Sequence, residues 1–517
     1  MTFKYNRFNL SSHCYYNYQR VIMLALTILL VSSVILLAFN FIGQYNERYW
    51  RYRGVKFYNK HKALGPIWEF ITKDRPLFEI FHDIYKQYPK EPAVGIGILL
   101  SPSLYVKDVQ NVQYVTQSIS NPRLSVDYNK DDQLADNLLF MSGGRWRLMR
   151  QNMTPLFTSL KLKNMYYIID KSSQDFVEYL INNPEKLHSK TFDTLTTFCC
   201  AAMGNAVFGV NYESTFKSPF LYATRKAFAP NFMNNFKFAV SAASPALFKT
   251  LNLKFFKEFE TFFIGAIKQV LRQREKEAVK KHDFIDLCMS IQKNGAMISD
   301  ETGYQMKPTD ELLAAQGFFF YTAGVEPTAS GIFGAMIQLG KHEDIQRRVQ
   351  EEVDVVFDKY NGKLPYEAIK ELQYLDKVLS ESLRILPPIG VLTKRCMEDA
   401  VLPVGNIRIE KGTKVFTPIY EYHHDPQYFE NCKVFNPERF SDKKKNWGIT
   451  YQPFGYGLRT CIGMRYARLQ VKSALANILR NFNLNTVIGK SGIKFRKDQV
   501  QVKSINVEVE YLPRELK

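Results

Sequence analysis

The chain has few cysteines from which disulfide bonds could form. Its 517 residues contain seven cysteines, an odd number, and these form neither a CxxC pair nor a regular spacing. The pattern excludes the disulfide framework of a small secreted domain. We therefore expect the body of the protein to face a reducing compartment, where a thiol can stay free to bind a metal.

Long runs rich in proline, glycine or serine are also missing, and so are internal repeats. Their absence predicts one large domain after the N-terminus. A hydrophobic content of 46% and an aromatic content of 14% exclude disorder. A charged fraction of 23% excludes a protein that lies mostly within a membrane.

Acidic residues are scarce relative to basic ones, with 50 Asp and Glu against 69 Lys and Arg and a net charge of +19. This balance favours partners of negative charge, which include nucleic acid, anionic lipid and an acidic protein. A run of three lysines, Lys443, Lys444 and Lys445, is either a localisation patch or a solvated face.

One long uncharged run is present, at residues 21–39. Its 19 residues nearly match the roughly 20 that a membrane-spanning helix needs. A cleaved signal peptide would have a shorter apolar core and a small-residue cleavage site, and neither is evident. A buried core helix is the other interpretation.

The charges around this run predict its orientation. Three basic residues precede it, and six follow it, namely Arg48, Arg51, Arg53, Lys56, Lys60 and Lys62. The richer side should stay cytoplasmic. The predicted organisation is a tail (1–20), a transmembrane anchor (21–42), a linker (43–65) and a cytoplasmic catalytic domain (66–517).

The body should be mainly helical. Apolar residues recur at helical spacing from about residue 134 to residue 383. Strands are expected between residues 391 and 416, where β-branched residues are joined by turns at Gly405 and Gly412. An aromatic-rich stretch is either core packing, a roof over an apolar pocket or a second membrane contact; it carries Phe228, Phe232, Phe236, Phe238 and Phe248.

A compact loop near the C-terminus, residues 454–463, carries the sequence FGYGLRTCIG before a predicted helix at 464–479. A lone cysteine is usually a small buried hydrophobe. At the start of a helix, however, the backbone N–H groups and the helix dipole favour the thiolate of Cys461. The loop fits all five fixed positions of FxxGxRxCxG, which chance would produce in roughly one chain in 10⁴.

This loop resembles the haem-binding signature of the cytochrome P450 superfamily, in which the cysteine is the axial iron ligand. The resemblance implies a mainly α fold with small β-sheets (α+β), preceded here by one transmembrane helix. It also implies that Cys461 binds the iron of haem b and that Arg459 pairs with a haem propionate. Phe454 would shield the sulfur, and three glycines would permit turns and close approach to the macrocycle: Gly455, Gly457 and Gly463.

Further motifs follow in the family's order. Glu381 and Arg384 are three residues apart on a helix, and the Pro437-Glu438-Arg439-Phe440 stretch comes later. An ExxR pair alone is common by chance. Together with Arg439 it resembles the structural triad of the family, a buried network that would have to be fully paired.

Two more positions resemble haem contacts of the microsomal group, which contains insect and vertebrate detoxifying members. Trp146 and Arg150 match a WxxxR pair that reaches a propionate; the alternative is a packing Trp beside a solvated Arg. Where the group has Arg two places before a cysteine, this chain has Lys394 followed by Arg395. Because neighbouring strand residues point to opposite faces, only one of these can meet the propionate.

A long apolar helix is expected at residues 312–339, and part of it resembles the oxygen-activating segment of the family. Gly324 would leave room for dioxygen, and Glu326 with a nearby hydroxyl would relay protons. Pro327 stands where the family usually has Thr, and Thr328 follows about 100° further around the helix. We hypothesise that a kink at Pro327 re-aims Thr328. Alternatively the helix is kinked and Glu326 is merely solvated.

The predicted function is a membrane monooxygenase of the endoplasmic reticulum that inserts one oxygen atom from O₂ into an apolar organic substrate. No nucleotide-binding glycine-rich loop is apparent, so NADPH electrons would come through a separate flavoprotein reductase, with cytochrome b5 as a further partner and no nucleic acid. The three lysines at 443–445, with Arg145 and Arg147, would form the docking face for that acidic reductase. The rivals are a haem isomerase or lyase that uses a peroxide substrate, supported by the displaced Thr328, and a haem protein that binds ligands without turnover.

Overall fold

The computed structural model describes the chain except for residues 1–6, 99–100, 122–130, 210–219, 221, 224–225, 227–231, 244, 278–279, 443–446 and 516–517. The N-terminal part contains α1 (Arg7–Arg51), α2 (Ile67–Ile71), α3 (Leu77–Gln87), α4 (Val109–Tyr114), α5 (Gly143–Met153), α6 (Ser159–Asn182), α7 (Thr191–Phe208), α9 (Phe232–Ala243) and α10 (Pro245–Thr250). There follow α11 (Glu260–Arg274), α12 (Phe284–Lys293), α13 (Asp310–Lys341), α14 (Glu343–Lys359), α15 (Tyr366–Glu371), α16 (Gln373–Ile385), α17 (Tyr420–His423) and α18 (Met464–Asn481).

The strands are short. They are β1 (Ala93–Ile98), β2 (Ser101–Val106), β3 (Ser120–Asn121), β4 (Met297–Ile298), β5 (Gln305–Met306), β6 (Val391–Cys396), β7 (Ala400–Leu402), β8 (Ile407–Ile409), β9 (Lys414–Pro418), β10 (Phe482–Ile488), β11 (Lys494–Phe495), β12 (Ser504–Ile505) and β13 (Val507–Pro513). The prediction of a helical body with strands between 391 and 416 is confirmed.

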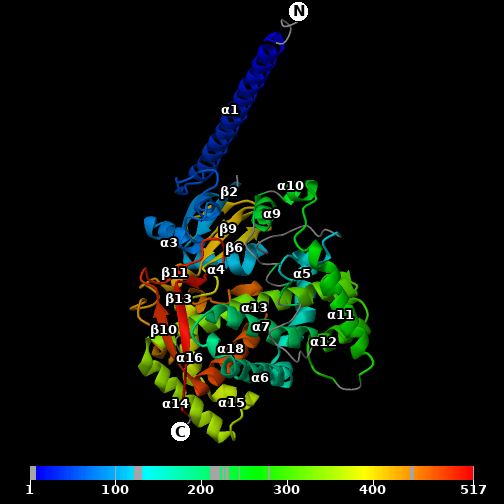
Figure 1. Cartoon of the computed structure of the whole chain (residues 1–517), viewed down its shortest axis with the longest axis vertical. Helices are drawn as coiled ribbons and strands as arrows, with labels where there is room; N and C mark the ends of the chain where they lie inside the picture. Colours follow the sequence, from blue (N-terminus) through cyan, green and yellow to red (C-terminus); the bar gives the residue numbers. More distant parts are fainter. Residues whose placement is uncertain are drawn as a thin grey trace, which may run out of the picture.

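Helix α13 is the centre of the helical body, with α7, α11, α16 and α18 packed around it. It starts where the Thr309 hydroxyl accepts the Leu312 N–H at 3.2 Å, which caps the helix. Most of its side chains are buried, as its apolar sequence requires, and it continues through Pro327 as one element. Figure 1 shows α13 crossing the body, with α18 and α6 on one side of it.

The five-stranded sheet has the order β1-β2-β9-β6-β3, in which only the β2–β9 pair is parallel. One face packs on α3, where the rings of Phe81 and Phe416 stack at 5.1 Å. The opposite face carries Val415 and Cys396 in a separate core with Trp50. The sheet is therefore covered on both faces.

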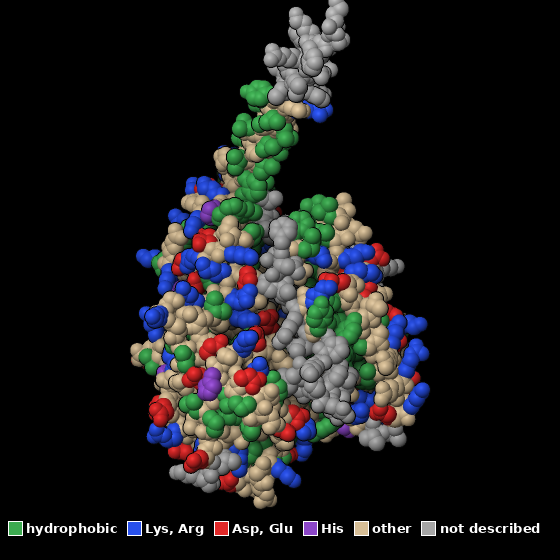
Figure 2. Space-filling model, in the orientation of Figure 1, with side chains coloured by type: hydrophobic (Ala, Val, Ile, Leu, Met, Phe, Trp, Pro, Cys, Tyr) green, Lys and Arg blue, Asp and Glu red, His purple; other side chains and the backbone are tan. Residues whose placement is uncertain are grey.

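Helix α1 begins outside the body and ends inside it (Figure 1). Residues Asn17–Arg51 are long and apolar enough to cross a membrane, and their most apolar window is fully exposed. Figure 2 shows this apolar rod rising from the folded body. One apolar N-terminal helix is thus present, as expected.

The segment expected to be a linker is instead packed. Helix α1 continues to Arg51, and Trp50 is 0% exposed. A Cβ on Gly95 of β1 would lie 2.6 Å from Cδ1 of Trp50, so the absent side chain makes room for the ring. Beyond the helix, Val55 and Phe57 are buried in the same core. Residues 43–65 are therefore part of the folded body.

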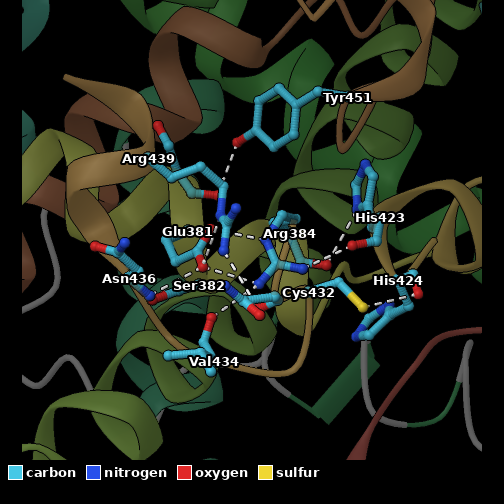
Figure 3. Close-up of polar contacts among 12 residues, drawn as sticks. Glu381, Ser382, Arg384, His423, His424, Cys432, Val434, Asn436, Arg439 and Tyr451 are labelled. Atoms are coloured by element: carbon cyan, nitrogen blue, oxygen red, sulfur yellow. Dashed lines mark hydrogen bonds and ion pairs between the residues drawn. The ribbon is translucent and has the colours of Figure 1, made fainter. Parts of the chain in front are cut away.

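The triad of buried charges forms as predicted (Figure 3). Arg384 on α16 is 0% exposed and donates to both carboxylate oxygens of Glu381 at 2.8 Å. Arg439 Nε approaches Glu381 at 3.4 Å, and the Asn436 N–H donates to it at 3.0 Å. Arg384 also donates to the His423 carbonyl at 2.6 Å, so the network ties α16 to the segment before the cysteine loop.

Candidate functional site

The cysteine loop is a sequence of tight turns that ends at α18. The Cys461 N–H donates to the Phe454 carbonyl at 2.9 Å, which closes the loop. Gly455 and Gly457 both have φ of 76°, a conformation that L side chains rarely adopt. Of the six cysteines whose side chains the structure describes, Cys461 is exposed and the others are buried.

Gly457 has a role that the sequence did not reveal. A Cβ there would lie 2.6 Å from the Thr116 carbonyl oxygen in the π-helical turn η1 (Val115–Ile119). Its missing side chain thus lets the loop dock on η1. The role of Gly457 in the approach of the macrocycle stays a prediction. At Gly463, by contrast, a Cβ would lie 4.0 Å from the Cys461 sulfur and would project beside it.

Three predicted haem contacts lie together next to the loop. The guanidinium of Arg459 stacks 3.6 Å above the ring of Trp146, which is 9% exposed, and Arg459 donates to the Met141 carbonyl at 3.1 Å. Arg150, one turn along α5 from Trp146, donates to the Thr460 carbonyl at 2.9 Å. Burial and the neighbouring Arg150 lower the pKa of Arg459 to about 9. Two guanidinium groups therefore repel each other in a half-buried place, where an anionic group would relieve the repulsion.

Lys394 and Arg395 point to opposite faces of β6. Lys394 is 6% exposed and shares its face with Leu392, whose Cδ1 would lie 3.8 Å from a Cβ on Gly455 of the cysteine loop. Arg395 instead donates to the Gly412 carbonyl at 3.3 Å and is paired in register with Lys414 of β9. Lys394 therefore lies on the loop face, and Arg395 does not.

The residues of the oxygen-side segment of α13 differ in their exposure. Ala323 is exposed and Pro327, one turn later, is half-buried, whereas Thr328 is only 6% exposed. The accessible face of this otherwise buried helix thus carries Pro327 rather than Thr328. A Cβ on Gly324 would lie 2.6 Å from Cε of Met203 on α7. The absent side chain of Gly324 makes room for Met203. The assignment of Gly324 to a space for dioxygen stays a prediction.

Glu326 is largely buried and forms an ion pair with Lys503. Its carboxylate lies 3.5 Å from the Lys503 ammonium, and both side chains are largely buried, with exposed fractions of 22% and 17%. Lys503 also lies 3.9 Å above the ring of Phe192 at the start of α7. Burial lowers the pKa of Lys503, and the Glu326 carboxylate opposes this shift. Sequence reasoning missed Lys503, because no motif marks the loop that carries it.

The expected reductase-docking residues are only partly available. Arg145 forms a two-bond ion pair with the buried Asp136, while Arg147 is exposed and lies 2.6 Å from the exposed Glu301. The segment that carries Asp136 is fixed to α13 by Gln316. The Gln316 side chain accepts from the Leu138 N–H and donates to the Asp136 carbonyl, both at 2.9 Å. The three lysines at 443–445 lie outside the described residues.

The residues that surround the loop suit a haem. Haem has one iron that accepts a thiolate and two carboxylates that need cations. An exposed thiol, two mutually repelling guanidinium groups and a buried lysine supply this donor set at Cys461, Arg150, Arg459 and Lys394. Ala323 and Cys461 both stay accessible although α13 and α18 are otherwise largely buried. A haem bound here would be held by the Cys461 thiolate and by these cations at its propionates.

The comparisons with known proteins agree with this site. The family model of cytochrome P450 matches residues 58–509, nearly all of the chain after the apolar helix. The chain therefore belongs to the cytochrome P450 family, the haem-thiolate monooxygenases, and its fold is the cytochrome P450 fold.

Its relatives include insect members of that family. Cytochrome P450 6a2 of Drosophila melanogaster is 32% identical over 481 residues, which cover 90% of this chain and 94% of the relative. Cytochrome P450 6B2 of Helicoverpa armigera is 30% identical over 465 residues, covering 88% and 91%. Cytochrome P450 9e2 of Blattella germanica is 30% identical over 514 residues, covering 93% and 95%.

Proposed function

We propose that this monooxygenase oxidises apolar small organic molecules on the cytoplasmic side of the endoplasmic reticulum membrane, with NADPH electrons delivered by a separate reductase. The observation that carries the proposal is the accessible thiol of Cys461 before α18, set among the cations Arg150, Arg459 and Lys394. In this arrangement Cys461 would ligate the haem iron, and the three cations would hold the propionates.

The bound haem supplies oxygen activation, to which a thiolate ligand contributes electron density. The residues of the chain stabilise the thiolate, shield it and hold a proton acceptor. The N–H groups at the start of α18 and the nearby Arg150 favour the thiolate form of Cys461. With haem bound, Phe454, which is partly buried and packs on the main core, would help to keep water from the sulfur. Glu326 holds a proton-accepting carboxylate on the oxygen side, positioned by Lys503.

The experiment that tests this function combines two measurements on the full chain in membranes. A carbon monoxide difference spectrum of the reduced protein should show the thiolate-type band. Product formation from a lipophilic library should then require NADPH and added reductase. Turnover of a peroxide substrate without reductase would favour the isomerase or lyase that the buried Thr328 suggests, and substrate binding without turnover would favour a ligand-binding protein.

The two faces of β6 give a matched prediction about haem retention. Replacing Lys394 by Gln should increase the haem dissociation constant by about tenfold, because a charge-assisted hydrogen bond to a propionate is lost. The Arg395→Gln variant should retain haem as the parent does, because that side chain lies on the other face. Haem transfer to apomyoglobin measures both. Equal loss in the two variants would contradict this placement.

The oxygen side gives a second matched prediction, about coupling of electrons to product. The Glu326→Gln variant should lower product yield per NADPH consumed by about tenfold, since the proton-accepting carboxylate is removed. The Thr328→Ala variant should change it by less than about twofold, because Thr328 is buried away from the accessible face. Product and peroxide assays give the ratio. A large loss in Thr328→Ala would instead support the hypothesis of a re-aimed hydroxyl.

A second membrane contact fits the aromatic-rich region better than core packing alone. Exposed apolar side chains gather on and beside α9 and α10, namely Met233, Phe236, Leu247 and Leu251. Figures 1 and 2 show these helices at the same end of the body as α1. Phe248 is buried and stacks on Phe255 at 4.8 Å, so part of the region is core. Phe228 lies outside the described residues.

The proposed topology is a single pass with the body in the cytoplasm, supported by the basic residues that follow the apolar run. Protease added to sealed microsomes should degrade the body, whereas protection of the body would place it in the lumen. Electron delivery through a basic surface predicts slower reduction at high salt. Cytochrome b5 is proposed as a second acidic partner on the same grounds.

A further inference from the structure

The ring of His423 is a buried group that neither the triad nor the expected haem contacts explain. His423 is the last residue of α17 and is 0% exposed. Its Nδ1 lies 3.2 Å from the Arg384 carbonyl of α16, and its Nε2 lies 3.1 Å from the backbone nitrogen of Gln452. Figure 3 shows the ring beside Arg384. One side chain therefore joins the backbone of α16 to the backbone of a segment 68 residues later in the chain.

The two partners determine where the His423 ring carries its proton. A carbonyl oxygen only accepts, so Nδ1 is protonated and donates to Arg384. A backbone N–H only donates, so Nε2 accepts from Gln452. Burial, with smaller contributions from His424 and Arg384, lowers the pKa of His423 well below its usual value. The ring is therefore neutral, and a proton on Nε2 would set one N–H against another at Gln452.

Gln452 is the entry to the cysteine loop. It is 1% exposed, and its side-chain amide donates to the Pro418 carbonyl at 2.9 Å. Its own carbonyl accepts the Gly455 N–H at 3.0 Å, which closes the first turn of the loop. The Phe454 carbonyl, two residues after Gln452, accepts the Cys461 N–H. The backbone of Gln452 thus sets the starting point of the loop that presents the thiol.

The residue before Gln452 strengthens the same connection. The ring of Tyr451 stacks on the ring of His423, with centroids 5.4 Å apart. The Tyr451 hydroxyl donates to the Ser380 carbonyl of α16 at 2.9 Å. The loop entry is therefore tied to α16 directly by Tyr451 and through the two ring nitrogens of His423.

We propose that His423, neutral and protonated on Nδ1, is a positioning residue that holds the entry of the cysteine loop on α16 and thereby keeps the Cys461 sulfur in place as an iron ligand. Both of its partners are backbone groups, so only the side chain at position 423 decides whether the contact forms. Without that side chain, a buried carbonyl and a buried N–H would be left unpaired. The inference rests on the proposed ligation of haem by Cys461.

The test follows the thiolate-type band of the full chain, purified with haem, after reduction and binding of carbon monoxide. His423→Phe keeps a flat ring but has no ring nitrogen, so both backbone partners lose their hydrogen bond. The half-life of the band should fall by about tenfold, because the unpaired groups loosen the loop entry. His423→Gln offers one donor and one acceptor, and it should restore the half-life to within about twofold of the parent.

Tyr422→Phe is the matched control from the same helix. Tyr422 is also 0% exposed, and its hydroxyl donates at 2.6 Å to the carbonyl of Lys107, directly after β2. The substitution removes a buried hydrogen bond of α17 without changing the contact to Gln452, so the band should keep the half-life of the parent. Equal half-lives in His423→Phe and Tyr422→Phe would overturn the positioning role.

Hydrogen exchange on the parent gives a second test that needs no variant. The backbone N–H of Gln452 should exchange slowly, because it is buried and hydrogen-bonded to the His423 ring. In His423→Phe its exchange should be about tenfold faster. Fast exchange at Gln452 in the parent would overturn the inference. A parent without the thiolate-type band would instead contradict the ligation by Cys461, which keeps the two failures apart.

Discussion

Replacing Cys461 by Ala is expected to abolish oxidation completely. The thiol is the exposed cysteine of the described chain and stands directly before α18, so no other described cysteine can take its place as a ligand. Without Cys461, bound haem would lack the thiolate that contributes electron density to oxygen activation. The reduced carbon monoxide spectrum should lose the thiolate-type band, and product formation with NADPH and reductase should fall to background.

The matched control for this experiment is Cys288→Ala. Cys288 is 0% exposed on α12, and burial raises the pKa of its thiol, so it stays protonated and inert. Its replacement should leave the thiolate-type band unchanged. A Cys461→Ala protein that kept the band, or a Cys288→Ala protein that lost it while remaining folded, would contradict the assignment of Cys461 as the ligand.

Replacing Glu381 by Gln should cause the largest loss of stability. Arg384 is fully buried, and its charge is compensated by the Glu381 carboxylate through two hydrogen bonds of 2.8 Å. Removing one partner of a buried ion pair leaves an uncompensated charge and costs about 3–5 kcal/mol in the free energy of unfolding. Urea unfolding monitored by circular dichroism measures this loss, and the yield of haem-loaded protein should fall with it.

A surface glutamate provides the comparison for Glu381. Glu371 pairs with Lys359 at 2.8 Å on the exposed surface, where solvent screens the charges. Glu371→Gln should unfold at nearly the same urea concentration as the parent. If Glu381→Gln also unfolded there, the buried triad would contribute little to stability, and its role in the fold would have to be reconsidered.

The features that the sequence predicted correctly are those with a local signature. The cysteine loop, the ExxR pair and the apolar run each lie within a few consecutive residues or turns, and spacing alone indicates which side chains share a face. Helix α13 was predicted at 312–339 and is observed at Asp310–Lys341, because its composition stays apolar along its whole length. The cytochrome P450 fold follows from these ordered motifs.

The features that the sequence did not predict are contacts between residues far apart in the chain. Glu326 meets Lys503 across 177 residues, and no pattern around either residue indicates the other. Met203, which lies next to Gly324, comes from another helix, and no pattern around Gly324 indicates this neighbour. The packed segment after the anchor was missed for the same reason, since only the sheet that Trp50 covers shows that it is not a linker.

The unbroken course of α1 from the apolar run to the buried Trp50 has a mechanical consequence. A helix advances about 1.5 Å and turns about 100° with each residue. The number of residues between the bilayer and the sheet therefore sets both the height of the body and the direction in which it faces. Inserting or deleting one residue of α1 between the bilayer and Trp50 would therefore rotate the body about the helix axis by about 100°.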